Sequence, residues 1–84
     1  MSRVRDFVEL VARALADESQ KVRVTEVEHG GSTLIEIYAA QRDVGKMIGR
    51  QGRTISALRT LTGVAAERAS QRVTVEVRDQ PAPE

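Results

Sequence analysis

The chain has 84 residues and a formal net charge of +1, with 40% hydrophobic residues, 30% charged residues and no cysteine. This composition is typical of one small globular domain and excludes a disordered chain, a disulfide framework and a thiolate metal site. No apolar run approaches the ~20 residues that span a bilayer, so we expect a cytoplasmic protein without a membrane segment.

The hydrophobic pattern predicts six elements in the order α-β-β-α-α-β. They are a helix over residues 3–17, strands over 21–28 and 33–40, a short helix over 43–48, a long helix over 53–70 and a strand over 72–79. Asp43 is the expected cap of the short helix. In the first strand, Val27 is out of phase with Val22 and Val24, which predicts a bulge or a twist there.

These elements predict an α+β fold in which three helices cover one face of a three-stranded sheet. Because a helical crossover leads from the second strand to the third, these two strands would be parallel if they are neighbours. We expect one domain over residues 1–79. Residues 80–84, QPAPE, contain two prolines and no apolar anchor, and are expected to form a disordered tail.

Positive charge is concentrated around two glycines that precede the long helix. Residues 42–59 carry a local charge of +4, whereas residues 1–41 carry −2 and residues 60–84 carry −1. Gly49 and Gly52 lack Cβ atoms and lie at the start of a helix, whose unpaired N–H groups attract anions. The pattern therefore favours a site for the backbone of a polyanion.

The two glycines allow three other interpretations. They could form a plain turn between two helices, with Gly49 as a C-cap. A Walker A loop would need glycine at position 47 and lysine at position 53, where the chain has Met47 and Arg53. The dinucleotide fingerprint also requires glycine at position 47. Nucleotide binding of either kind is therefore disfavoured.

Residues 48–55, IGRQGRTI, have the form I-G-x-x-G-x-x-I and follow a predicted hairpin. This resembles the KH domain in its type II, prokaryotic arrangement, and it is most similar to small bacterial proteins with a single KH domain. The family's GXXG loop clamps about four nucleotides of a single strand. The resemblance assigns the clamp to Gly49, Arg50, Gln51 and Gly52, electrostatic support to Lys46 and Arg53, and the wall of an apolar base groove to Ile48 and Ile55.

The resemblance implies a single-stranded RNA-binding protein of low sequence specificity, such as an RNA chaperone or a post-transcriptional regulator. Single-stranded DNA is a second ligand that KH domains accept. Phe7 and Tyr38 are the only aromatic residues, too few for extensive base stacking. Phe7 is expected in the core and Tyr38 on the exposed face of its strand.

The long helix carries a second apolar patch, formed by Ala57, Leu61 and Val64. Either the helix over residues 3–17 packs against it, or it is an interface. The second interpretation predicts a homodimer, which would join two weak binding loops and raise avidity. The family resemblance also implies a larger RNA-binding partner protein. An alternative function follows from the same patch and the small net charge, namely a protein-interaction adaptor with little affinity for RNA.

No catalytic or metal-binding group is expected. His29 is the only histidine and lies in the predicted turn, so no catalytic triad can be assembled with it. Glu26, Glu28 and Glu36 could meet across the hairpin, but solvated acidic side chains are the commoner explanation. We expect no enzymatic activity, no cofactor and no metal.

Overall fold

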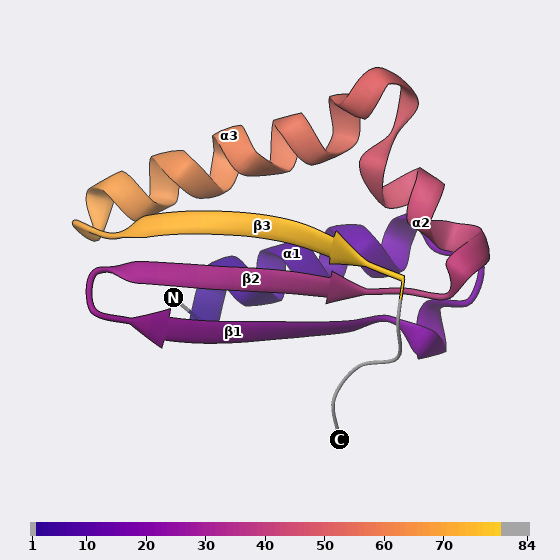
Figure 1. The fold of residues 1–84 in the computed structure, drawn as a ribbon, viewed down its shortest axis with the longest axis horizontal. Helices are drawn as coiled ribbons and strands as arrows, with labels where there is room; N and C mark the ends of the chain where they lie inside the picture. Colours follow the sequence, from indigo (N-terminus) through magenta and orange to yellow (C-terminus); the bar gives the residue numbers. More distant parts are fainter. Residues whose placement is uncertain (1, 80–84) are drawn as a thin grey trace.

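The computed structural model describes residues 2–79, and the segment expected to form a tail, 80–84, lies outside them (Figure 1). The elements are helix α1 (Ser2–Leu15), the 3-10 turn η1 (Ser19–Lys21), strands β1 (Arg23–His29) and β2 (Ser32–Tyr38), helix α2 (Gln41–Ile48), the 3-10 turn η2 (Arg50–Gly52), helix α3 (Arg53–Arg68) and strand β3 (Arg72–Arg78). The predicted element order is confirmed, although both long helices end about two residues earlier than expected.

The three strands form one sheet in the order β1-β2-β3. β1 and β2 are antiparallel and are joined by a two-residue turn, Gly30–Gly31, in which Gly30 has a φ of +62°. β2 and β3 are parallel, as the helical crossover predicts, and they pair without interruption from Ser32 opposite Arg72 to Tyr38 opposite Arg78. β1 and β3 are therefore the two edge strands.

The hydrophobic core lies between one face of the sheet and the helices. Alternation along the strands directs every second side chain toward the helices, which bury them. The core contains Val24, Ile35, Ile37 and Val75 from the strands, Val8 and Ala12 from α1, Met47 from α2, and Ile55 and Leu58 from α3. The predicted α+β fold with helices on one face of the sheet is confirmed.

The opposite face of the sheet corrects two expectations. β1 pairs with β2 residue by residue, so there is no bulge at Val27, which is 53% exposed on this open face. Tyr38 also lies on this face, yet only 7% of it is exposed. Since Tyr38 is on the central strand, the long side chains of Arg23 and Arg78 flank it on the two neighbouring strands.

The three acidic residues of the hairpin do not all converge, because Glu36 lies on the other face of the sheet from Glu26 and Glu28. Glu36 lies opposite Thr25 on the open face, whereas Glu26 lies opposite Ile35 on the face that the helices cover. Within residues 2–79, no group of three or more metal-ligating side chains comes together. None of the helices in this range combines the length and the hydropathy needed to cross a bilayer.

Candidate nucleic-acid interface

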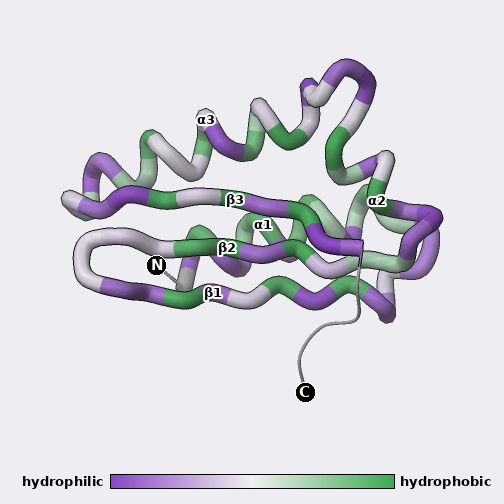
Figure 2. Tube along the Cα trace, viewed as in Figure 1, coloured by the Kyte–Doolittle hydropathy of each residue, from purple (hydrophilic) through white to green (hydrophobic). Residues whose placement is uncertain are grey.

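The turn between α2 and α3 has a backbone that two glycines make accessible. After Ile48 the chain turns at Gly49, whose φ is 80° and whose N–H donates to the carbonyl of Gly45 at 2.8 Å. Gln51 and Gly52 then adopt left-handed conformations, with φ values of 55° and 72°. The Gly52 N–H donates to the Gly49 carbonyl at 3.0 Å, which closes the turn. Figure 2 shows this turn as a hydrophilic segment.

The two glycines are required for different reasons. A Cβ on Gly49 would collide with the side chain of Thr54 and would lie 2.8 Å from its backbone nitrogen. A Cβ on Gly52 would have no neighbour within 4 Å, so only its positive φ favours glycine. Gly49 therefore lets the start of α3 approach α2 closely, and Thr54 is a supporting residue that the sequence pattern did not reveal.

The N-terminus of α3 is open to an anion. Its N-cap is Gly52, and no side chain caps it. The first backbone N–H groups of a helix lack intrahelical partners and carry a partial positive charge. Arg50 and Arg53 are exposed beside them, and within residues 2–79 neither arginine pairs with a carboxylate. Arg53 donates only to the side-chain oxygen of Gln51, at 3.3 Å.

Lys46 lies close to the turn but is already paired. Its Nζ is 2.6 Å from Asp17 Oδ2 and 3.1 Å from Asp43 Oδ1, and these contacts raise its pKa. Arg42 also pairs with Asp17, at 3.1 Å, and the pKa of Asp17 is lowered mainly by its hydrogen bond from Lys46. The fold thus brings Asp17, an acidic residue from far along the sequence, to Arg42 and Lys46, two of the basic residues in the positively charged segment 42–59.

Asp43 does not cap α2, contrary to expectation, since Ala40 occupies the N-cap position. Its carboxylate is completely buried and accepts the backbone N–H groups of Asp17 and Glu18, both at 3.0 Å. These two hydrogen bonds lower its pKa to about 2. Asp43 therefore ties α2, and with it the start of the turn, to the chain that leaves α1.

The two isoleucines that flank the turn are placed differently. Ile55 belongs to the hydrophobic core and is 7% exposed, whereas Ile48 is 40% exposed at the end of α2. Ile55 thus supports the turn from below, and Ile48 offers an apolar surface directly beside it. The eight residues predicted to bind RNA lie within the segment from Lys46 to Ile55, which runs from the end of α2 through the turn to the start of α3.

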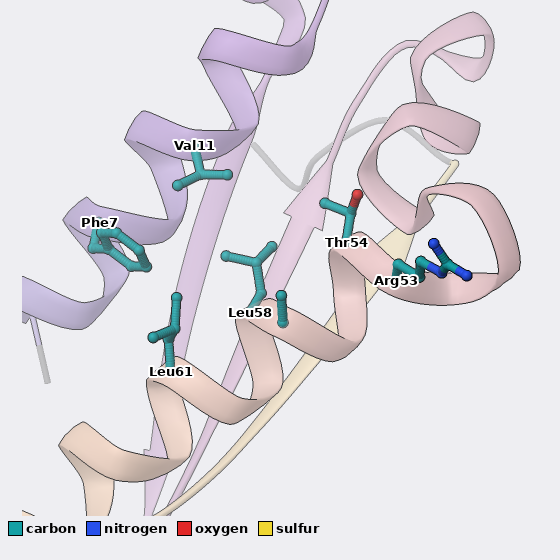
Figure 3. Close-up of a pocket in the computed structure, with 7 residues that line it drawn as sticks. Phe7, Val11, Arg53, Thr54, Leu58 and Leu61 are labelled. Atoms are coloured by element: carbon teal, nitrogen blue, oxygen red, sulfur yellow. The ribbon is translucent and has the colours of Figure 1, made fainter.

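On its other side, α3 forms an apolar groove with α1. The groove encloses about 320 Å³ and is lined by Phe7, Val11, Arg53, Thr54, Ala57, Leu58 and Leu61. In Figure 3, Phe7 and Val11 face Leu58 and Leu61, while Arg53 extends away toward the turn. Phe7, expected in the core, instead forms the rim of this groove. Leu61 and Val64 are each 54% exposed, so α1 does not cover the patch that the sequence indicates.

A sheet in the order β1-β2-β3, with β3 parallel to β2 and a G-x-x-G turn between α2 and α3, defines a KH domain of the type II arrangement. A family model described as "KhpA/KhpB, KH domain" matches residues 5–77, and the chain belongs to this family. The family is a KH-domain family and not a known class of enzyme.

Curated relatives match over nearly their whole length. "RNA-binding protein KhpA" of Aquifex aeolicus is 42% identical over 77 residues, which cover 92% of this chain and 98% of the relative. The proteins of the same name from Caldanaerobacter subterraneus and Halalkalibacterium halodurans are 42% and 41% identical, over 86% and 90% of this chain and 96% and 100% of their own lengths. No solved structure matches the chain significantly.

Proposed function

We propose that this protein binds single-stranded RNA by clamping the sugar-phosphate backbone in the turn from Gly49 to Gly52. The observation that carries the proposal is the uncapped N-terminus of α3, with two arginines beside it that pair with no carboxylate within residues 2–79. Backbone N–H groups and guanidinium groups both bind phosphate oxygens. The relatives named "RNA-binding protein KhpA" support RNA as the polyanion.

Recognition of this kind is dominated by the nucleic-acid backbone. Arg50 and Arg53 supply direct countercharge, and Lys46 neutralises Asp17 and Asp43 beside the turn. Ile48 offers an apolar surface to a base beside the turn, and Ile55 holds the turn in place from the core. Because backbone contacts carry no sequence information, the protein would bind many RNAs weakly, as an RNA chaperone or a post-transcriptional regulator. Single-stranded DNA, which shares the phosphate backbone, would be a second ligand.

Fluorescence anisotropy with a short labelled single-stranded RNA tests the clamp. The wild type is compared with the double variant Arg50→Asp/Gln51→Asp, which places two carboxylates where the phosphate would lie. We expect the variant to lose at least ~100-fold in affinity, because like charges repel and two phosphate contacts disappear. Circular dichroism and thermal melting show whether both proteins are folded.

The control variant Arg72→Asp/Gln71→Asp makes the same change of charge at the start of β3, away from the turn. It should bind RNA about as well as the wild type. Equal affinity of all three folded proteins would refute the clamp. If the wild type bound no RNA, the alternative of a protein-interaction adaptor would be favoured; at present the family relationship does not favour it.

We further infer that the protein is a homodimer joined through the apolar side of α3. Thr54, Ala57, Leu61 and Val64 follow one stripe along the helix, with small side chains near its N-terminus and larger ones farther on. Two antiparallel copies related by a two-fold axis would therefore place Leu61 against the partner's Ala57 and Val64 against the partner's Thr54. A monomer at every concentration in sedimentation velocity would contradict this.

The family description, which joins KhpA and KhpB, supports a KhpB-like RNA-binding protein as a heteromeric partner for the same surface. Residues 1–79 would act as one domain in the cytoplasm. Two weak clamps in a dimer would bind one RNA more tightly than a single clamp does. Co-purification of the wild type with a KhpB-like protein, and its loss when the groove is charged, checks this partner.

A further inference from the structure

The edge of β3 that faces away from β2 lies beside α3 and carries unused backbone groups. The Arg72 N–H donates toward the hairpin, to the Gly31 carbonyl at 2.8 Å. Because backbone groups alternate in direction along a strand, Val73, Val75 and Val77 direct their N–H and C=O groups away from β2. An RNA that leaves the turn can therefore meet either this polar edge or the apolar groove on the other side of α3.

Arg59 of α3 is fixed at this polar edge. Its Nε and Nη2 both donate to the carbonyl oxygen of Val75, at 3.2 and 3.1 Å. Two bonds to one acceptor orient the planar guanidinium. They leave both hydrogens of Nη1 and one hydrogen of Nη2 on the edges that face away from that carbonyl. Arg59 is exposed, and within residues 2–79 it has no other partner.

Its position suits a base next to the clamp. Arg59 follows Arg53 by six residues, which is about 9 Å along a helix axis and about 120° around it, so Arg59 lies on the β3 side of α3 beyond the turn. The carbonyls of Val73 and Val77 point to the same edge, so a phosphate group would meet acceptors there and be repelled. A base edge presents donors as well as acceptors and fits these surroundings better. The free Nη1 and Nη2 hydrogens form a pair of parallel donors.

We propose that Arg59 reads a guanine base in the single strand held by the turn, by donating two hydrogen bonds to guanine O6 and N7. Guanine presents these two acceptors side by side, and arginine is the side chain that matches them. Arg59 is thus a specificity-determining residue in a protein whose remaining contacts are insensitive to sequence. This inference rests on the proposed RNA-binding function and adds to it a base preference at one position.

The experiment measures the affinity of a series of short oligouridines, each with guanosine, adenosine or cytidine at one position. For the wild type we expect guanosine at one position to raise the affinity about tenfold over uridine. In Arg59→Lys and Arg59→Gln this preference should disappear. The affinity for plain oligouridine and its salt dependence should be unchanged, because no phosphate contact is removed.

Arg5 offers a control, because it also donates to a strand carbonyl at the other edge of the sheet and, in addition, pairs with Asp6 and Glu9. Its Nη1 donates to the carbonyl of Val24 on β1 at 2.8 Å. Arg5→Gln should cost at least as much thermal stability, because its ion pairs are lost too, and should leave the guanosine preference intact. Arg59→Lys keeps a donor and a charge near Val75, so it separates the loss of base reading from the loss of folding.

Each other outcome overturns the inference in a distinguishable way. If the wild type binds all oligonucleotides equally, Arg59 does not discriminate between bases, whereas the proposed binding of RNA at the turn is unaffected. If Arg59→Gln weakens binding to every sequence equally and reduces the salt dependence, Arg59 contacts a phosphate instead. If the preference survives in both folded Arg59 variants, another residue provides it. If the wild type binds no RNA at all, the proposed function itself fails.

Discussion

The two sides of α3 differ in almost every chemical property. Toward β3, the helix presents Arg59, which donates to the carbonyl of Val75 at the outer edge of that strand. Toward α1, it presents an apolar groove and the exposed side chains of Leu61 and Val64. A single helix of 16 residues can thus serve a nucleic acid on one side and a protein on the other.

The two sides meet in the first turn of α3. Thr54 packs against Gly49 of the clamp and also lines the apolar groove. Arg53 lines the groove as well, while its guanidinium extends toward the turn. The two sides of α3 are therefore separate along most of the helix and share residues only in its first turn. Substitutions in the first turn of α3 should therefore affect both RNA binding and dimer formation, whereas substitutions farther along the helix should affect only one of them.

The largest effect is expected from Gly49→Ala, which acts at the point where the two sides meet. The added Cβ collides with Thr54 and forces alanine into a positive φ. We expect a loss of about 2–4 kcal/mol in the free energy of unfolding, measured by urea denaturation. Gly52→Ala has open space for its Cβ and should cost only about 1–2 kcal/mol. Equal losses in the free energy of unfolding for the two variants would show that the side chain of Thr54 moves away from the added Cβ at little cost.

The next effect tests whether the sides are separable. Leu61→Glu places a carboxylate in the apolar stripe, and we expect the dimer dissociation constant to rise about 100-fold in sedimentation equilibrium. Affinity for a short RNA that spans one clamp should stay unchanged. Thr60→Glu adds the same charge one residue away, outside the stripe, and should leave the dimer intact. Dimers of unchanged strength in Leu61→Glu would refute the interface.

The smallest effect is expected in the salt dependence of RNA affinity, which distinguishes the contributions of Arg53 and Lys46. Arg53→Gln removes a cation without a carboxylate partner, so the slope of log affinity against log salt should become shallower by about 0.7. Lys46→Gln removes a cation that already pairs with Asp17 and Asp43, so its slope should change less. Lys46→Gln should instead lower the melting temperature. Identical slopes for both variants would mean that Lys46 leaves its carboxylates when RNA binds.

Much of the fold could be predicted because it depends on local patterns. Alternating valines and isoleucines identify the strands, and the helical crossover accounts for the parallel pairing of β2 and β3. The G-x-x-G turn was located by its residues alone, since both glycines adopt positive φ angles. These features depend on residues within a few positions of one another.

The errors concern contacts between distant residues. Asp43 was expected to cap its own helix, but its partners Asp17 and Glu18 lie 26 and 25 residues earlier in the chain. Tyr38 was expected to be exposed because hydrophobic alternation places it on the open face of the sheet. Alternation does not reveal that Arg23 and Arg78 lie beside it on the neighbouring strands. The contact of Arg59 with Val75 has no local signature either. Hydrophobic periodicity indicates which face of a helix or strand a residue occupies, whereas tertiary packing determines which residues it contacts.

Two arginines of the helices donate to carbonyl groups of the outer strands, and this has a consequence for the behaviour of the protein at high concentration. β1 and β3 are both edge strands of seven residues, and such edges can recruit strands from other molecules into a growing sheet. Arg5 occupies the Val24 carbonyl on one edge, and Arg59 occupies the Val75 carbonyl on the other. Each places a charged guanidinium group where an incoming strand would have to pair, and Arg5 also holds the carboxylates of Asp6 and Glu9 there. The same side chain that we propose to admit a base thus protects the domain against aggregation through its sheet.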